Sequence, residues 1–159
     1  MLAPVRTDCD QRHHAWPLFL RTYSALVDVL DEELRTESGL PLTWFDVLAH
    51  LAAAPEGRLR MHDLASHILL SKSGLTRLVD RMEAAGLVER APCPRDRRVV
   101  YARLTARGLD TFQRAAPVAF RGVSEHFSRH LTPAEESAFT SALGKMLDAL
   151  TCAPERKAV

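Results

Sequence analysis

Residues 71–105 read SKSGLTRLVDRMEAAGLVERAPCPRDRRVVYARLT, a pattern that indicates a helix followed by a hairpin. The first part predicts a helix over residues 72–85. The Ser71 hydroxyl can accept a hydrogen bond as its N-cap, and Gly86 suits the left-handed conformation that closes a helix. Apolar residues recur on one side at helical spacing and predict its buried face. They are Leu75, Leu78, Val79 and Met82.

Two short strands are predicted next, over residues 87–90 and 99–104. Between them, residues 92–98 read PCPRDRR, a turn-rich and basic hairpin tip. Upstream, residues 61–68 predict a short helix and residues 69–71 a tight connection. Helix, tight turn, helix and basic hairpin, in that order, form a helix-turn-helix followed by a wing.

Another short helix is predicted upstream of the helix-turn-helix, over residues 44–53. Thr43 is expected to be its N-cap, with Asp46 as the acidic capping partner. Residues 58–60 read as a short extended piece that leads into the helix-turn-helix.

Longer helices flank this module on both sides. Residues 12–37 carry apolar side chains at helical spacing. Thr105 caps a predicted helix that runs to about residue 130, and Pro117 is expected to bend it or break it in two. Thr132 and the proline and glutamate that follow it predict the start of a last helix, which ends near residue 150.

Composition limits the class of protein. The chain has 159 residues, 47% apolar and 26% charged, which suits a single globular domain. No apolar run approaches the roughly 20 residues of a membrane span, and the N-terminus lacks a signal-peptide pattern. Three cysteines without a C-x-x-C pair argue against a disulfide framework or a thiolate zinc site. We therefore expect a soluble, cytoplasmic protein with no membrane partner and no cofactor.

The charge is unevenly distributed, although the net charge is only +1. Between Arg58 and Arg107 there are eleven basic and five acidic residues, while the rest of the chain has ten basic and fifteen acidic ones. A basic block of this kind is a candidate surface for the phosphates of DNA.

The exposed face of the predicted 72–85 helix has side chains suited to DNA. In a helix-turn-helix, the second helix enters the major groove, and its N-terminal half reaches the base edges. A narrow basic hairpin can place an arginine in the minor groove. Taken alone, the same charges could mark a solvated helix beside a charged loop. The predicted DNA-contacting residues are Ser71, Lys72, Ser73, Thr76, Arg77, Arg81, Arg95 and Arg97.

The run from Ser71 to Arg90, the wing sequence PRDRR and the following Leu104-Thr105 resemble the signature of the MarR (multiple-antibiotic-resistance regulator) family of winged helix-turn-helix repressors. The resemblance implies a mainly α fold with a small β-hairpin wing, in a single domain over residues 1–159. Residues 43–104 would form the winged helix-turn-helix, and 12–37 and 106–151 the dimerisation helices.

The resemblance also implies partners and roles. The protein would be a homodimer, and two DNA-binding faces related by a two-fold axis require a palindromic operator. Asp96 and Arg98 would pair to brace the wing, leaving Arg97 to enter the minor groove.

Family members often release DNA when a small aromatic or phenolic anion binds between the dimerisation helices and the DNA module. An aromatic stripe at helical spacing can also be ordinary core packing, so both interpretations stay open. The residues expected to line such a cleft are Trp16, Phe19, Tyr23, Trp44, Asp46 and His50.

Peroxide sensing and urate sensing are two alternatives to an aromatic effector. Cys9 precedes the position of a peroxide-sensing cysteine in one subfamily, and Cys93 stands among prolines and arginines. Asp46, Arg77 and Arg90 match three positions of a urate-sensing subfamily, but its tryptophan has no counterpart here.

Metal sensing and enzymatic activity are two further alternatives. His126 and His130 are four residues apart, a spacing that can hold zinc on one helical face, although a helix C-terminus also favours histidines. No G-x-S-x-G, H-E-x-x-H or glycine-rich phosphate loop is present, so an enzyme on this fold is not expected. A winged-helix scaffold that does not bind DNA remains the alternative from a different class.

Overall fold

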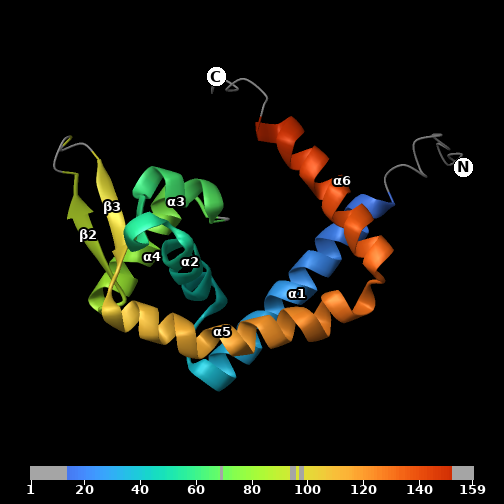
Figure 1. The fold of residues 1–159 in the computed structure, drawn as a ribbon, viewed down its shortest axis with the longest axis horizontal. Helices are drawn as coiled ribbons and strands as arrows, with labels where there is room; N and C mark the ends of the chain where they lie inside the picture. The colour runs from blue at the N-terminus through green and yellow to red at the C-terminus, as the bar shows by residue number, and fades with distance from the viewer. Residues whose placement is uncertain (1–13, 69, 94–95, 97–98, 152–159) are drawn as a thin grey trace, which may run out of the picture. The chain divides into compact units, whose positions relative to one another are not determined.

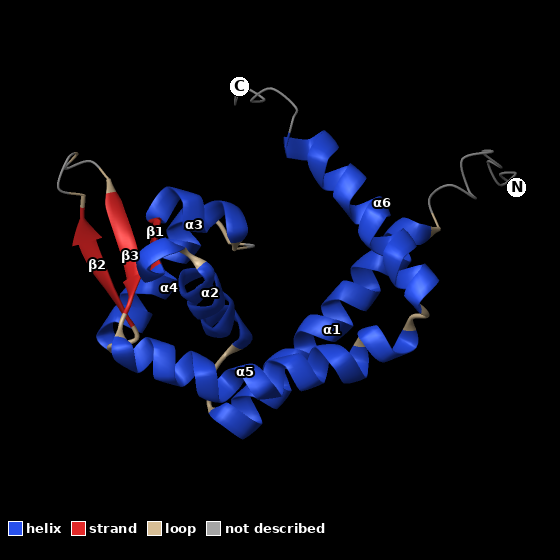
Figure 2. Ribbon diagram, viewed as in Figure 1, coloured by secondary structure: helices blue, strands red, loops and turns tan. Residues whose placement is uncertain are grey.

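The computed structural model describes residues 14–68, 70–93, 96 and 99–151, with the backbone alone at Lys72. The chain divides into two compact units after Phe120. The structure is mainly helical, with one small sheet in the first unit (Figures 1 and 2). The helices of the first unit are α1 (Ala15–Ser38), α2 (Leu42–Ala53), α3 (Met61–His67), α4 (Lys72–Ala84) and the first part of α5 (Ala106–His126).

The junction between α1 and α2 differs from the predicted cap. Thr43 lies inside α2, whose N-cap is Pro41, so the prediction that Thr43 caps this helix is wrong. The Leu42 amide instead donates a hydrogen bond of 2.7 Å to Oδ1 of Asp31 on α1. Burial raises the pKa of Asp31, but hydrogen bonds from Arg35 and from the Leu42 amide outweigh it and leave the pKa below its ordinary value. A side chain of α1 therefore caps α2.

The helix-turn-helix matches the sequence prediction closely. The Ser71 hydroxyl accepts a hydrogen bond of 3.1 Å from the Gly74 amide at the start of α4. Gly86 has a φ of +72°, a left-handed conformation that glycine adopts without strain. The four predicted apolar residues of α4 are all buried. Capping and the apolar stripe thus fix the helix and its orientation against the core.

A three-stranded antiparallel sheet takes the place of the predicted two-stranded hairpin. Its strands are β1 (Arg58–Arg60), β2 (Val88–Pro92) and β3 (Val100–Leu104), in the order β1-β3-β2. The piece over residues 58–60, expected only to be extended, pairs along β3, with Arg58 opposite Arg103 and Arg60 opposite Tyr101. The extra strand anchors the wing to the segment that leads into α3.

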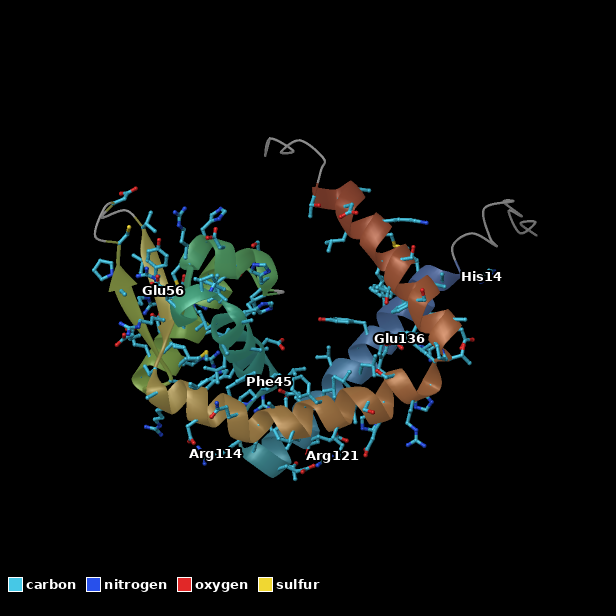
Figure 3. The ribbon with its side chains drawn as sticks, in the orientation of Figure 1. His14, Phe45, Glu56, Arg114, Arg121 and Glu136 are labelled. Atoms are coloured by element: carbon cyan, nitrogen blue, oxygen red, sulfur yellow. The ribbon has the colours of Figure 1, made fainter. Side chains whose placement is uncertain are left out.

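The core of the first unit joins α2 to α5. The Phe45 and Phe112 rings stack with their centroids 5.4 Å apart, and Figure 3 shows Phe45 where α2 meets α5. Leu48, Leu51 and Ala102 are fully buried in the same cluster. The helix-turn-helix and the sheet thus share one core with the start of α5.

Of the bend or break expected at Pro117, the break does not occur, because α5 is one continuous helix through this residue. Proline removes one helical hydrogen bond, but Ala115, Ala116 and Ala119 on either side are buried, and this packing compensates for the loss. Thr105 caps α5 as predicted, because its hydroxyl accepts a hydrogen bond of 2.9 Å from the Gly108 amide.

The second unit contains the end of α5, the 3-10 turn Ser128–His130 and α6 (Pro133–Thr151). Because α5 ends at His126, His126 and His130 do not share one face of an α-helix, which contradicts the spacing considered for zinc. Thr132 and Glu135 form the predicted reciprocal cap of α6, with the Thr132 amide donating a 2.8 Å hydrogen bond to Glu135. Among the described residues, no helix combines the length and the apolar character needed to cross a membrane.

Candidate nucleic-acid interface

The outer face of α4 presents the polar side chains that the sequence pattern placed there. Ser73, Thr76, Arg77 and Arg81 are all exposed. The Ser71 hydroxyl also lies 3.2 Å from that of Ser73, so hydroxyl groups cluster at the N-terminal end of the helix. The Lys72 side chain lies outside the described part of the structure. This arrangement offers hydrogen-bond donors and positive charge at the helix end that would meet base edges.

Arg90 on β2 holds the sheet against α4. Its guanidinium lies 2.6 Å from a carboxylate oxygen of Asp80 and 2.6 Å from one of Glu83, both on α4. The Arg90 amide donates a further hydrogen bond of 2.9 Å to Glu83. Because these charge-assisted bonds come from one residue, they fix the position of the sheet relative to the helix. Sequence analysis identified Arg90 only as a match to a urate sensor and missed this role.

The wing tip is described only in part. The Val99 amide donates to the Asp96 carbonyl and the Cys93 amide donates to the Val99 carbonyl, each at 3.0 Å, which closes the tip on the strands. Arg95, Arg97 and Arg98 lie outside the described residues, so the pairing expected between Asp96 and Arg98 stays a prediction. Cys93 is partly buried and forms no disulfide within the described residues, and Cys9 precedes the described range.

Basic side chains also gather around Tyr101 on the sheet. The Arg58 guanidinium lies over the Tyr101 ring, 5.1 Å from its centroid, and forms a salt bridge of 2.5 Å with Glu56. Arg60 is opposite Tyr101, and a hydrogen bond with that residue raises the pKa of Arg60 above its ordinary value. A cavity of about 510 Å³ lies nearby, and Arg60, Thr76, Arg90 and Val100 help to line it.

The residues predicted to bind an effector fall into two groups. Trp16, Phe19 and Tyr23 lie on the N-terminal part of α1 and are at least 40% exposed, and the first two rings stack 6.2 Å apart. Trp44 lies on α2 and packs against the core. None of these four aromatic residues lines the 510 Å³ cavity near Tyr101.

The polar members of the predicted effector site, Asp46 and His50, lie one turn apart on α2. Partial desolvation of the carboxyl raises the pKa of Asp46, and His50 opposes this shift. The His50 imidazole stacks on that of His67, the last residue of α3. Sequence analysis missed His67 because the two histidines are brought together only by the packing of α2 on α3.

Comparison with known proteins identifies relatives that share the helix-turn-helix. A model of the MarR family matches residues 38–99. YkoM of Bacillus subtilis (strain 168), an HTH-type transcriptional regulator, is 30% identical over 109 residues, which are 69% of each chain.

Solved structures of MarR family regulators share the fold of this chain over most of its length. Sco3205 of Streptomyces coelicolor, a MarR family regulator in complex with DNA, is 29% identical, with a TM-score of 0.84 over 96% of this chain and 94% of that one. A second structure is that of BpsR of Bordetella bronchiseptica, whose DNA binding is regulated by 6-hydroxynicotinic acid. Its sequence is 26% identical to this chain. It has a TM-score of 0.71 over 82% of this chain and 96% of that one. With its helix-turn-helix, its wing and its flanking helices all shared with such regulators, the chain belongs to the MarR family of DNA-binding transcription regulators.

Proposed function

We propose that the protein is a homodimeric repressor that binds a palindromic operator and is released from it by a small aromatic or phenolic effector. The observation that carries this proposal is the exposed polar and cationic face of α4, fixed to the wing by the Arg90 contacts with Asp80 and Glu83. A rigid helix of this kind can reach base edges, while the wing contacts the flanking backbone.

Exposed apolar side chains support the dimer. On α1, Trp16, Leu18 and Tyr23 are 62%, 64% and 44% exposed. On α6, Met146 and Leu147 are 58% and 62% exposed. Soluble monomers rarely expose such patches, and a second copy of the same chain would cover them.

In the proposed complex, α4 of each protomer lies in a major groove and Arg97 enters the minor groove, with Asp96 and Arg98 bracing the wing. Removal of a base-reading arginine should weaken binding to the preferred sequence by about 1–3 kcal/mol. We therefore expect Arg77→Ala or Arg81→Ala to lower operator affinity by that amount.

The matched control is Arg114→Ala, because Arg114 is an exposed arginine on α5 that pairs with Asp110. Fluorescence anisotropy with labelled duplex DNA at fixed ionic strength measures all three variants. Equal affinities for Arg77→Ala, Arg81→Ala and Arg114→Ala would contradict the assignment of α4 as the reading helix.

The effector proposal rests on the aromatic residues of α1 and on Trp44, Asp46 and His50 of α2. BpsR offers a parallel, because a hydroxylated aromatic acid regulates its DNA binding. We expect an aromatic carboxylate or phenol to quench the fluorescence of the two tryptophans and to weaken DNA binding. Release that instead requires zinc or Cys93 would favour a metal or redox sensor.

A further inference from the structure

Two imidazole rings stack at the contact between α2 and α3. The centroids of His50 and His67 are 4.9 Å apart, and the ring planes differ by 24°. Two neutral rings, or one neutral and one charged ring, can keep this arrangement. Two imidazolium ions at this distance would repel each other, because each carries a full positive charge.

The stack is connected to a carboxyl group. Burial lowers the pKa of His50, the nearby His67 lowers it further, and Asp46 partly opposes both effects. Among the described residues, His67 and Asp46 are the charged groups that shift this pKa. The protonation of His50 therefore depends on a neighbour from each of the two helices.

Charged groups on the other elements around α2 and α3 are mostly engaged with one another. Asp31 pairs with Arg35 on α1, Arg58 with Glu56 beside β1, and Arg103 of β3 with Glu89. On α4, Asp80 and Glu83 bind Arg90, and on α3 itself Asp63 lies 3.6 Å from His62. Among the described residues, Asp46 is the carboxylate that raises the pKa of His50.

The position of the stack links it to the DNA-reading helix. His67 is the last residue of α3, and the buried side chain of Ile68 follows it. Ser71, three residues later, caps α4. A change in the spacing of α2 and α3 at His67 would therefore move the start of α4, where base contacts are expected.

We propose that the His50–His67 stack makes DNA binding sensitive to acid, because two protonated imidazoles repel each other, separate the end of α3 from α2 and displace the start of α4. This inference rests on the proposed DNA binding of α4.

The sign of the effect follows from proton linkage. The folded-state pKa of His50 lies below the ordinary 6.5, so the folded protein favours the neutral ring. The contribution of neutral His50 to the stability of the fold is therefore fully present above pH 6.5. It is lost as the pH falls from 6.5 toward the folded-state pKa. The fraction of the protein with an intact stack should fall over the same range. The affinity for DNA should fall with it, because this is the form proposed to bind DNA.

The test compares the full-length wild type with His67→Gln, in which the second imidazole is replaced by a neutral side chain. Anisotropy with one operator duplex is measured from pH 8 to pH 5.5 at constant ionic strength. One linked proton changes affinity by at most tenfold per pH unit. We expect wild-type affinity to fall about three- to tenfold more than that of His67→Gln over this range. The control His130→Gln, on the 3-10 turn, should follow the wild type.

Identical pH profiles for the wild type and His67→Gln would overturn the proposal. A second measurement needs no DNA: in NMR titrations, the pKa of His50 should rise in His67→Gln, because a repelling neighbour has been removed. An unchanged His50 titration would also overturn it. If the wild type binds no DNA even at pH 8, the proposed function fails instead, and the titration still reports on the stack.

Discussion

Replacement of Gly108 by alanine is expected to lower the free energy of unfolding by about 3 kcal/mol, at the upper end of the usual cost of overpacking. A Cβ atom at Gly108 would lie 2.0 Å from the Leu87 carbonyl oxygen and 2.9 Å from a Leu104 methyl carbon. The carbonyl belongs to the backbone leading into β2 and cannot turn aside. The added atom would push the first turn of α5 away from the sheet and strain the Thr105 cap.

Gly144→Ala is the matched control. Gly144 is also in a helix, but no atom lies within 4 Å of its added Cβ. Alanine is favoured over glycine in a helix interior by about 1 kcal/mol, so this variant should be as stable as the wild type or more stable. Urea denaturation of both variants measures the difference, and equal losses of stability would contradict the close packing at Gly108.

Leu147→Glu on α6 should convert the proposed dimer into monomers. Leu147 is 62% exposed in the single chain, so a charge there costs the isolated protomer little. A dimer interface would bury that charge without a partner. Because two linked reading heads bind far more tightly than one, we expect operator affinity to fall on the order of 100-fold.

Lys145→Glu controls for the change of charge, because Lys145 is an exposed residue of the same helix. Sedimentation analysis gives the mass of each variant. If Leu147→Glu remains a dimer and binds DNA as the wild type does, then α6 does not form the interface around this residue.

The parts of the fold predicted from sequence are those that depend on neighbouring residues. The Ser71 hydroxyl accepts a hydrogen bond from the Gly74 amide, and the Thr105 hydroxyl accepts one from the Gly108 amide. Thr132 bonds to Glu135, so each of these caps joins residues three positions apart. Such short-range bonds leave a recognisable spacing of residue types in the sequence. The apolar stripe of α4 also predicts which face of that helix is buried.

The errors arose where distant residues decide the structure. The N-terminus of α2 is capped by Asp31, eleven positions before Leu42, so the local signal at Thr43 was misleading. The strand β1 needs Arg103 opposite Arg58, a pairing that no short window contains.

The candidate site divides in the same way. The exposed residues of α4 follow from helical spacing alone. The Arg90 contacts and the His50–His67 stack join separate elements, so they became visible only with the fold. For Arg90, the signal was the carboxylates of Asp80 and Glu83, three residues apart and therefore on one side of α4.

We propose that this protein reads double-stranded DNA with two copies of α4. Selection from a library of randomised duplexes, followed by a salt titration of the enriched sequence, tests this proposal. We predict an inverted repeat with half-site centres about 34–36 Å apart, or one helical turn, and an affinity that falls steeply with salt. A library that yields no enriched sequence, or binding that does not change with salt, would contradict the account.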